Sequence, residues 1–422
     1  MDKRVYLLTI VSFVVGLAEL ILGGILHLVA QDFNVSLGRA GMLISIFSFV
    51  YAISGPILLS TTSKVERKKL ILITLLVFLF ANVIAWLSTG YSMLLLARVL
   101  SGISASLLIS LCVTIASNIV SEAYRARAIG VVFMGVTGSL VLGVPLGLVL
   151  GNSFGWNAPF LLIVILTVIS IIFIYFSMDK IEPKSGIPLK KQLKEQLSSL
   201  KSRKIVLIQL TSFLFISGHL ILYAYLTPYL EATLGLEGNW ISIILLIFGV
   251  AAIIGGGLGG FLSDRFGPQR CIIGIIIFFT ISLISIPFSI KFFPLFIVVL
   301  MMWSMLSWAL TPAIQSYLIV TARENSDIQQ SINNSATHLG IALGSMIGGV
   351  VIEYSRIEIN PIVGAIFALF SLFVVSLTMI KGKKTQKNEA GPEFSQSAYK
   401  KVQGLEPGIT KINFDDKLNA NK

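Results

Sequence analysis

The chain has 422 residues, of which 55% are hydrophobic and only 12% are charged, and its mean hydropathy is +0.89. Soluble globular proteins carry about 25% charged residues, so this composition excludes an ordinary water-soluble fold. The net charge of +12 does not indicate a nucleic-acid partner, because the basic residues lie in loops and tails between apolar segments. Cys112 and Cys271 lie at or inside apolar segments without CxxC or histidine spacing, so neither a disulfide nor a metal site is predicted.

Twelve apolar segments are each long enough to cross a membrane as a helix, which takes about 20 residues because every backbone polar group must be bonded within the helix. The first apolar run is too long for a signal peptide and lacks a small-residue cleavage site, so it is predicted to be the first membrane helix. The composition therefore predicts an all-α membrane protein with twelve transmembrane helices. The predicted spans are 5–30, 40–62, 69–89, 92–119, 127–151, 157–178, 204–230, 240–263, 270–290, 292–320, 328–354 and 359–380.

Lysine and arginine are distributed unequally between the two sides of these spans. Of the 32 basic residues, 28 lie in the tails or in loops on the side of the N-terminus. Because lysine and arginine are enriched in cytoplasmic loops, this excess predicts that both termini of a cell-membrane protein are cytoplasmic. Residues 1–178 and 204–380 are predicted to form two six-helix bundles, joined by a cytoplasmic linker over 179–203. The polar, lysine-rich residues 381–422 are predicted to be a disordered cytoplasmic tail.

The two halves are weakly similar at a shift of 200 residues. The dipeptide Ser12-Phe13 aligns with Ser212-Phe213, and Glu19 then falls opposite His219. A repeat of six helices is typical of transporters whose halves rock about a central site. Low complexity is the alternative explanation for the matches between helices. The repeat predicts that the two bundles are pseudo-symmetric.

The loop after the eighth span contains Gly260, Asp264, Arg265, Gly267 and Arg270, and its sequence resembles the G-x-L-x-D-R-x-G-R motif of the major facilitator superfamily. An aspartate near a helix end can pair with arginine and lock an inner gate, and an exposed ion pair in a short turn is the alternative. The corresponding loop of the first half departs from the motif at Ser63 and Glu66, so its gating role is in doubt. The predicted gating residues of the second loop are Gly260, Asp264, Arg265, Gly267 and Arg270.

The fifth span contains Gly143, Pro145 and Gly147, which resemble the glycine-proline element of antiporter branches in that superfamily. Small residues let helices approach closely and proline bends a helix, so the element is predicted to act in gating and to favour export. Generic glycine packing is the alternative. The glycines of the eleventh span, beginning with Gly340 and Gly344, look like the second-half counterpart.

Three ionisable residues inside spans are predicted to take part in proton coupling. Glu19 is a carboxylate deep in the first span, Arg98 lies in an R-x-x-x-G element of the fourth, and His219 is the pseudo-symmetric mate of Glu19. Charged groups at membrane depth are costly, so they are functional candidates by default. The alternatives are a structural acid paired with Arg98, an Arg98 side chain that reaches the outer face, and a histidine that makes one interhelical hydrogen bond.

Aromatic and polar side chains within the other spans are predicted to bind substrate, since stacking plus a few hydrogen bonds suits a planar or amphipathic organic solute. An anchoring role at the membrane surface is the alternative for tryptophan and tyrosine. The predicted substrate-binding residues are Asn118, Tyr223, Tyr225, Trp303, Trp308, Gln315, Asn334 and His338.

Over residues 5–380 the chain resembles the twelve-helix drug:proton antiporter branch of the major facilitator superfamily, in particular bacterial exporters of drugs, sugars, and purine bases or nucleosides. The resemblance implies export of a small organic solute by alternating access, with the proton as coupling ion and no other cofactor. Alternating access needs no partner protein, so a monomer is predicted. Proton-coupled uptake is the alternative. A membrane-embedded enzyme is less favoured, because no HExxH, GxSxG or P-loop motif occurs, and a sensor is less favoured, because the tail is too short for an output domain.

Overall fold

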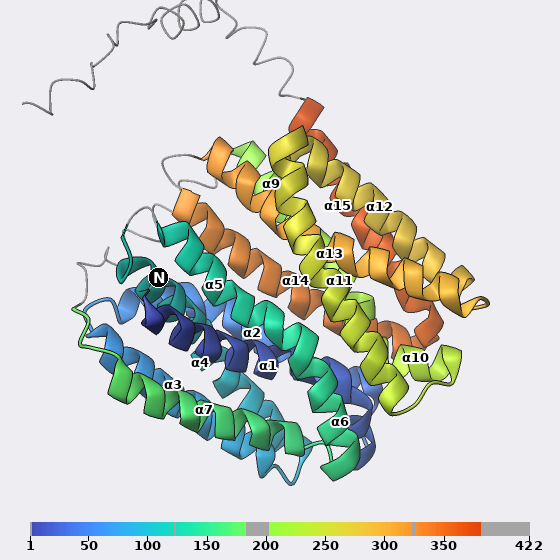
Figure 1. Ribbon diagram of the computed structural model, residues 1–422. Coiled ribbons are helices and arrows are strands. Elements are labelled where there is room, and N and C mark those ends of the chain that lie inside the picture. Colours follow the sequence, from blue (N-terminus) through green and yellow to red (C-terminus); the bar gives the residue numbers. More distant parts are fainter. Residues whose placement is uncertain (1, 122–123, 183–201, 323–325, 381–422) are drawn as a thin grey trace, which may run out of the picture. The chain divides into compact units, whose positions relative to one another are not determined.

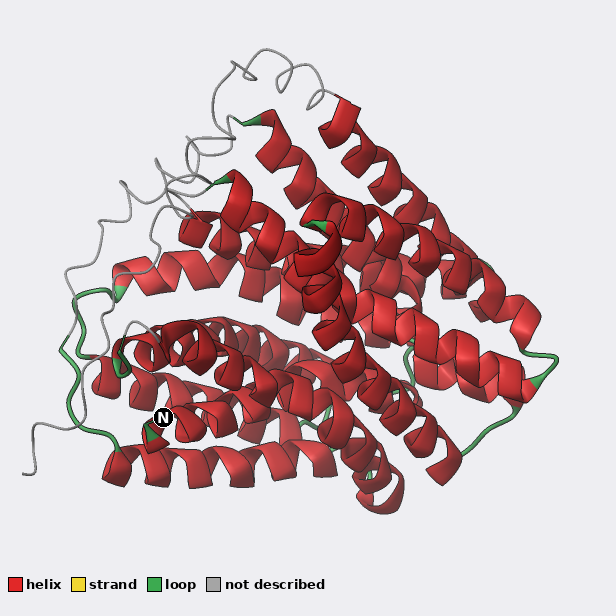
Figure 2. Ribbon diagram, turned by 45° about the horizontal axis from the view of Figure 1, so that its top comes forward, coloured by secondary structure: helices red, strands yellow, loops and turns green. Residues whose placement is uncertain are grey.

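The computed structural model describes residues 2–121, 124–182, 202–322 and 326–380. Within these residues, twelve helices are long and apolar enough to span a membrane, and no described residue lies in a strand (Figure 2). The predicted all-α fold with twelve membrane helices is therefore confirmed. Residues 183–201 of the predicted linker and the predicted tail over 381–422 lie outside the described residues.

The first half begins its first three helices with side-chain caps. Asp2, Ser36 and Glu66 accept hydrogen bonds from backbone N–H groups in the first turns of α1, α2 and α3, which satisfies donors that have no partner within a helix. The elements of this half are α1 (Lys3–Asp32), α2 (Leu37–Thr61), α3 (Arg67–Trp86), α4 (Tyr91–Asn118), α5 (Arg125–Gly138), η2 (Ser139–Gly143), α6 (Val144–Phe154) and α7 (Ala158–Ser177).

Proline lies in the first turn of helices of the second half, among them α12 and α13. Pro268 lies in the first turn of α12 and Pro294 in that of α13, where the missing N–H has no helical partner to lose. The elements are α9 (Arg203–Tyr223), α10 (Leu226–Leu234), α11 (Asn239–Phe266), α12 (Pro268–Ser289), α13 (Phe293–Thr321), α14 (Ser326–Tyr354), η4 (Ile357–Ile359) and α15 (Asn360–Ile380).

Two predicted spans are interrupted, which corrects the expectation of continuous helices. The fifth span consists of α5, the π-helical turn η2 and α6, and η2 ends directly before the turn that contains Pro145. Proline cannot donate the hydrogen bond that a continuous helix requires, so the backbone rearranges there. The seventh predicted span, 204–230, divides into α9 and α10 at Ala224 and Tyr225. Pro228 has no N–H to bond the carbonyl of Ala224, four residues earlier, as a continuous helix would require.

Helix pairing repeats between the halves (Figure 1). In the first half α1 packs on α5 and α2 packs on α4; in the second half α9 packs on α14 and α11 packs on α13. These pairs occupy corresponding places in the two sets of six spans. The repeated pairing supports the pseudo-symmetric architecture that the sequence similarity predicts.

The halves meet most closely at one end of the bundle. We call the end where α1 begins and α2 ends the near end, and the end that holds α6 and α10 the far end (Figure 1). The Ser36 hydroxyl donates to the Glu353 carboxylate at the far end, and Ser45 and Ser345 bond at 2.7 Å further in. Helix α11 packs more extensively on η2 and α6 than on α5. The contacts therefore close the far end more tightly than the near end.

Candidate functional site

A carboxylate and an imidazole from the two halves meet in the middle of the bundle. Glu19 lies on α1 and His338 on α14, and Glu19 Oε1 is 3.6 Å from His338 Nδ1. Their side chains are only 15% and 8% exposed. Ionisable groups at membrane depth are costly unless they pair or line a polar path. The pair is therefore the leading candidate site, and the sequence pointed to both residues without indicating that they meet.

Arg98 on α4 is fixed by backbone carbonyls. Its Nη1 donates to Ala18 O at 2.7 Å, its Nε donates to Leu43 O at 3.3 Å, and the guanidinium lies 4.1 Å from the Phe47 ring centroid. Arg98 is 1% exposed, so its side chain does not reach the outer face. The guanidinium thus lies against the carbonyl of Ala18, the residue before Glu19 on α1. The described contacts include no direct ion pair between Arg98 and Glu19, which the sequence had left open.

Tyr51 and Asn334 complete the surroundings of His338. The Tyr51 ring on α2 stacks on the imidazole with centroids 3.7 Å apart and planes inclined by 22°, and the Asn334 side chain is within hydrogen-bonding reach of the Tyr51 hydroxyl. Asn334 is exposed. The sequence reasoning missed Tyr51, because stacking between residues of different halves leaves no spacing signal in the chain.

His219 does not join this cluster but lies in an aromatic group of the second half. Its ring stacks on Tyr223 with centroids 5.2 Å apart and planes at 13°, and its centroid is 5.1 Å from that of Trp303. Phe248 on α11 contacts both Tyr223 and Trp303 at 5.2 and 5.1 Å. The structure therefore brings together three of the predicted substrate-binding or coupling residues in the second half, His219, Tyr223 and Trp303.

The other predicted substrate-binding residues are not gathered in one place. Tyr225 is fully buried and its hydroxyl donates to Ser345 O at 2.7 Å, so it packs between helices in this conformation. Asn118 is the last residue of α4 at the near end. Trp308 and Gln315 on α13 are half-buried. Substrate roles for these four residues stay predictions.

The predicted glycine-proline element packs along α1. A Cβ at Gly143 would lie 2.6 Å from Leu17 Cδ1, and one at Gly147 would overlap Ile21. The small glycines leave room for these α1 side chains, and the contact sets η2 and α6 against the helix that carries Glu19. Because of these contacts, a movement of the fifth span would displace side chains of the first span. Its gating role, with that of Pro145, stays a prediction.

The eleventh span repeats this arrangement in the second half. A Cβ at Gly340 would lie 2.7 Å from Phe213 O, and one at Gly344 only 2.3 Å from Ser217 O. Helix α14 therefore packs on α9 as α5 and α6 pack on α1. His338 lies on this close-packed helix, so its backbone is held against α9.

The gating motif of the second half forms the turn between α11 and α12. Gly267 has φ of 82°, a left-handed conformation that glycine adopts without strain. Asp264, Arg265 and Arg270 are exposed, and the Arg265 guanidinium lies 5.5 Å from the Phe266 centroid. A Cβ at Gly260 would meet nothing within 4 Å. The motif glycine is explained by the turn, and the gating roles stay predictions.

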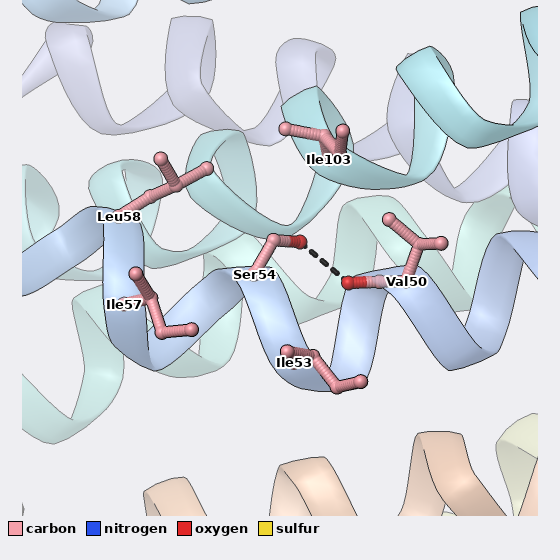
Figure 3. A pocket seen from close by; sticks show the side chains of 6 residues that line it. All are labelled: Val50, Ile53, Ser54, Ile57, Leu58 and Ile103. Carbon is pink, nitrogen blue, oxygen red and sulfur yellow. Dashed lines mark hydrogen bonds between the residues drawn. The ribbon is translucent and has the colours of Figure 1, made fainter.

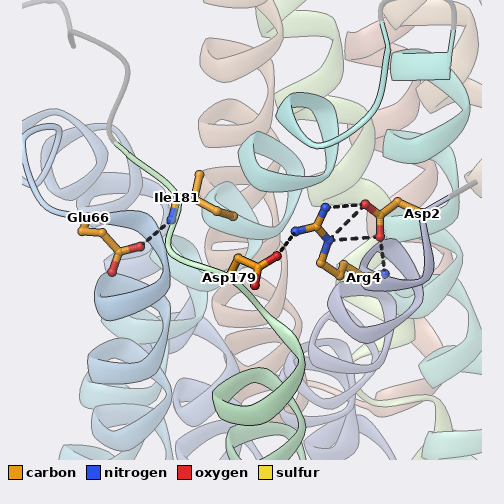
Figure 4. Close-up of polar contacts among 5 residues, drawn as sticks. All are labelled: Asp2, Arg4, Glu66, Asp179 and Ile181. Carbon is orange, nitrogen blue, oxygen red and sulfur yellow. Dashed lines mark hydrogen bonds and ion pairs between the residues drawn. The ribbon is translucent and has the colours of Figure 1, made fainter.

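The corresponding loop of the first half fastens the beginning of the linker (Figure 4). The Glu66 carboxylate accepts hydrogen bonds of 2.8 Å from the N–H groups of Lys68, Lys69 and Ile181, and Arg67 N donates to Ile181 O. Burial alone raises the pKa of Glu66, but these backbone bonds outweigh it and lower the pKa below its ordinary value. Glu66 is therefore a capping and anchoring residue here.

A second fastening lies beside it. The Arg4 guanidinium forms ion pairs with Asp2 at 2.6 Å and with Asp179 at 3.0 Å (Figure 4). The chain leaving α7 is thus attached to the beginning of both α1 and α3. Residue spacing in the sequence does not predict the contact of Glu66 with Ile181 or that of Arg4 with Asp179.

A shallow depression of about 320 Å³ lies elsewhere, on α2 and α4 (Figure 3). Ser54 is the polar residue of its lining, and the Ser54 hydroxyl bonds Val50 O at 2.6 Å. Ile53 and Ile57 in this lining are exposed, as is expected of a surface that faces lipid tails. With no free polar group, the depression offers a solute little to bind, so the Glu19–His338 cluster remains the candidate site.

Comparison with known proteins places the chain in a family. Residues 8–328 and 228–412 match the model of the Major Facilitator Superfamily. An uncharacterized MFS-type transporter of Bacillus subtilis, YbcL, is 34% identical over 91% of this chain and 97% of its own length. The inner membrane transport protein YdhP of Escherichia coli is 28% identical over 90% of this chain and 96% of its own. A probable sugar efflux transporter of Mannheimia succiniciproducens is 24% identical over 91% of this chain and 96% of its own.

Solved structures share the fold at low sequence identity. A bacterial homolog of the human lysosomal transporter Spinster, in an inward-facing and unoccupied conformation, has a TM-score of 0.74 at 15% identity and covers 93% of this chain and 100% of its own. The human organic anion transporter MFSD10 has a TM-score of 0.64 at 15% identity, covering 89% and 100%. The chain belongs to the Major Facilitator Superfamily, and it is a multi-pass cell-membrane transporter and not an enzyme.

Proposed function

We propose that the protein is a proton-coupled exporter of a small organic solute. The observation that carries the proposal is the Glu19 carboxylate, held in the middle of the bundle 3.6 Å from an imidazole of the other half. A nearly buried carboxylate can gain and lose a proton where its charge affects how the halves meet. Such a group can exchange a proton for a solute during alternating access.

The position of Glu19 distinguishes it from the other acidic residues of the described spans. Each of those lies within about one helical turn of a helix end, where the headgroup region and water are near. Glu19 instead lies about half-way along α1, several turns from either end of the helix. The acids near helix ends are Asp32, Asp264, Glu353 and Glu358.

Export is favoured by the close-packed glycine-proline element and by the predicted orientation. If the basic loops and both termini are cytoplasmic, the near end faces the cytoplasm. The structure, closed more tightly at the far end, then represents an inward-facing protein ready to receive a cytoplasmic solute. Uptake by symport uses the same fold and is the second candidate.

The solute is proposed to be planar or amphipathic, such as a drug-like compound or a purine. Support comes from the aromatic group of His219, Tyr223, Phe248 and Trp303, whose rings suit stacking on a flat molecule. One relative carries the name of a probable sugar efflux transporter. Sugar export is therefore included among the substrates to be tested. We propose that the proton is the coupling ion and that a monomer suffices.

The test is transport in everted vesicles under an imposed pH gradient, with fluorescent drugs, radiolabelled purines and radiolabelled sugars as probes. We expect gradient-driven accumulation of one probe class by the wild type. Glu19→Gln keeps the size of the side chain but removes its ionisation, so accumulation should fall to the background of vesicles that lack the protein.

Glu358→Gln is the matched control, because Glu358 is an exposed carboxylate at the beginning of the last span, and it should transport like the wild type. Transport by Glu19→Gln at the wild-type rate would refute the coupling role of Glu19. Accumulation only in right-side-out vesicles would replace export with uptake.

A further inference from the structure

The contact between Glu19 and His338 joins the two halves of the protein. Glu19 lies on α1 of the first half and His338 on α14 of the second. His338 Nδ1 is buried and has no hydrogen-bond partner within the described residues. At 3.6 Å from Oε1 it is just beyond hydrogen-bond length, so a small side-chain movement closes the gap. Whatever strengthens this contact stabilises the conformation in which α1 and α14 lie together.

The charges around the pair decide how many protons it holds. Arg98 on α4 and the hydroxyls of Tyr51 on α2 and Tyr223 on α9 interact electrostatically with Glu19. Arg98 is always positively charged, so it is balanced by an ionised Glu19 with a neutral His338. The pair can then take up one further proton, and no second carboxylate is required for it.

That proton changes the contact between the halves. Without it, a carboxylate meets a neutral ring, and in the tautomer whose proton sits on Nε2 two lone pairs oppose each other. With it, Nδ1–H donates to Oε1 as a charge-assisted hydrogen bond, or the protonated Oε1 donates to Nδ1. The protonated pair therefore always has a proton to share between Oε1 and Nδ1, whereas the unprotonated pair has one only when the ring proton sits on Nδ1. The stacked Tyr51 ring keeps the imidazole plane in place for it.

We infer that His338 and Glu19 act as one proton-binding pair across the halves, and that binding of a single proton holds the protein in the conformation closed at the far end. The inference rests on the proposed proton coupling and deepens it by naming the second titratable group and the conformation it selects. In an exporter, a proton that enters from outside would return the protein to the state that receives solute from the cytoplasm. His338, assigned to substrate binding from the sequence, thereby becomes a coupling residue.

The experiment measures the distance between two spin labels at the near end, without substrate or gradient. Labels are attached at Lys64→Cys and Gln269→Cys, both exposed positions of different halves, after Cys112 and Cys271 are replaced by alanine, in lipid nanodiscs. Spectra are recorded at about pH 5 and about pH 8, on either side of ordinary histidine titration. The population with the longer near-end distance should grow at low pH, by up to about tenfold in the population ratio per pH unit for one linked proton.

Variants then assign the response. His338→Gln and, independently, Glu19→Gln should each reduce the pH response to what the far-end contact of Glu231 with His27 contributes. His219→Gln is the matched control: its ring lies in the aromatic group of the second half, so the response should persist. His27→Gln tests the other histidine–carboxylate contact between the halves, His27 Nε2 to Glu231 Oε1 at 3.4 Å, and should also keep the response.

A wild type without pH response, or a His338→Gln protein with the full response, overturns the inference. So does a response lost only in His27→Gln, which would assign the switch to the far end. Because no solute is present, a protein that exports none of the vesicle probes but still shows the His338-dependent response would remove the proposed substrates and leave the pair standing.

Discussion

At the scale of single residues, Arg98 shows why an arginine and not a lysine occupies this depth. Its Nη1 and Nε donate in two directions, to Ala18 O and Leu43 O, while its plane covers the Phe47 ring. A lysine ammonium is a compact charge that cannot reproduce this fork. The same positive charge would then be less well bonded.

We therefore expect Arg98→Lys to destabilise the protein by about 1.5–3 kcal/mol, the range for a lost hydrogen bond to a charged group. Thermal unfolding of the purified protein measures the change. Arg203→Lys, at an exposed position at the start of α9, is the comparison and should leave the unfolding temperature nearly unchanged. Equal unfolding temperatures for Arg98→Lys and the wild type would contradict the role given to the fork.

The far end contains a titrating residue outside the membrane spans. Burial, and secondly the charge of Glu237, raise the pKa of Glu231 to about 7. The folded protein therefore binds more protons than the unfolded chain between the ordinary glutamate pKa and about pH 7, so stability falls as pH rises through this window. In Glu231→Gln the fall should be smaller.

Unfolding temperatures from about pH 4.5 to about pH 8 provide the measurement for wild type and Glu231→Gln. Glu237→Gln removes the second cause, so its stability should fall less steeply near neutral pH than that of the wild type. A Glu231→Gln protein that loses as much stability as the wild type over this window would show that Glu231 does not titrate there.

At the residue scale, the sequence identifies ionisable residues that are unusual in apolar segments, but it does not identify which residues they contact. A carboxylate, an arginine and histidines inside apolar segments are conspicuous, so Glu19, Arg98 and His338 were found. Their partners were not, because the residue opposite Glu19 in the repeat is His219 while the residue near it in space is His338. The register of α14 against α1 depends on packing between halves, which no spacing along the chain records.

At the scale of elements, glycine spacing determines how closely helices pack. Gly344 lies where a Cβ would be 2.3 Å from Ser217 O, whereas Gly274 on α12 has nothing within 4 Å. Backbone cannot yield as a flexible side chain can, so Gly344→Ala should push α14 from α9. We expect a loss of about 1–3 kcal/mol, as for other overpacked sites.

Gly274→Ala is the matched substitution in open space and should be neutral or slightly stabilising. Unfolding temperatures of the two variants, recorded side by side, give the comparison. Equal effects would mean that the α9–α14 interface relaxes around an extra methyl group and that the close approach is not required.

Element existence was predictable because twelve apolar runs leave few alternatives in a membrane. Element continuity was not. The division of the fifth span at η2 and of the seventh between α9 and α10 follows from how Pro145 and Pro228 are accommodated, and hydropathy does not distinguish a bent helix from a straight one.

At the scale of the whole molecule, the six-helix repeat gave the architecture correctly, and the structure adds which surfaces hold the halves together. Ser45 and Ser345 place their hydroxyl oxygens 2.7 Å apart across the α2–α14 interface. If the halves rock, these residues must separate during transport. A covalent link between them should stop the cycle.

In a background free of Cys112 and Cys271, the pair Ser45→Cys and Ser345→Cys should form a disulfide under oxidation and lose transport. A reductant should restore transport, and each single cysteine variant should be unaffected by oxidation. Full transport by the cross-linked protein would show that the α2–α14 interface does not open.

The chain that leaves α7 is bound by the loop of the first half that corresponds to the motif loop of the second half. In the second half the motif loop ends α11 with exposed charges, whereas in the first half the matching loop is tied by Glu66 to the chain that leaves α7. The two loops therefore differ in their contacts: the loop of the second half keeps its charged motif residues exposed, and the loop of the first half binds the chain after α7. Exchanging the two loops between the halves would remove the contact between Glu66 and Ile181. The symmetry of the fold therefore does not make the two loops interchangeable.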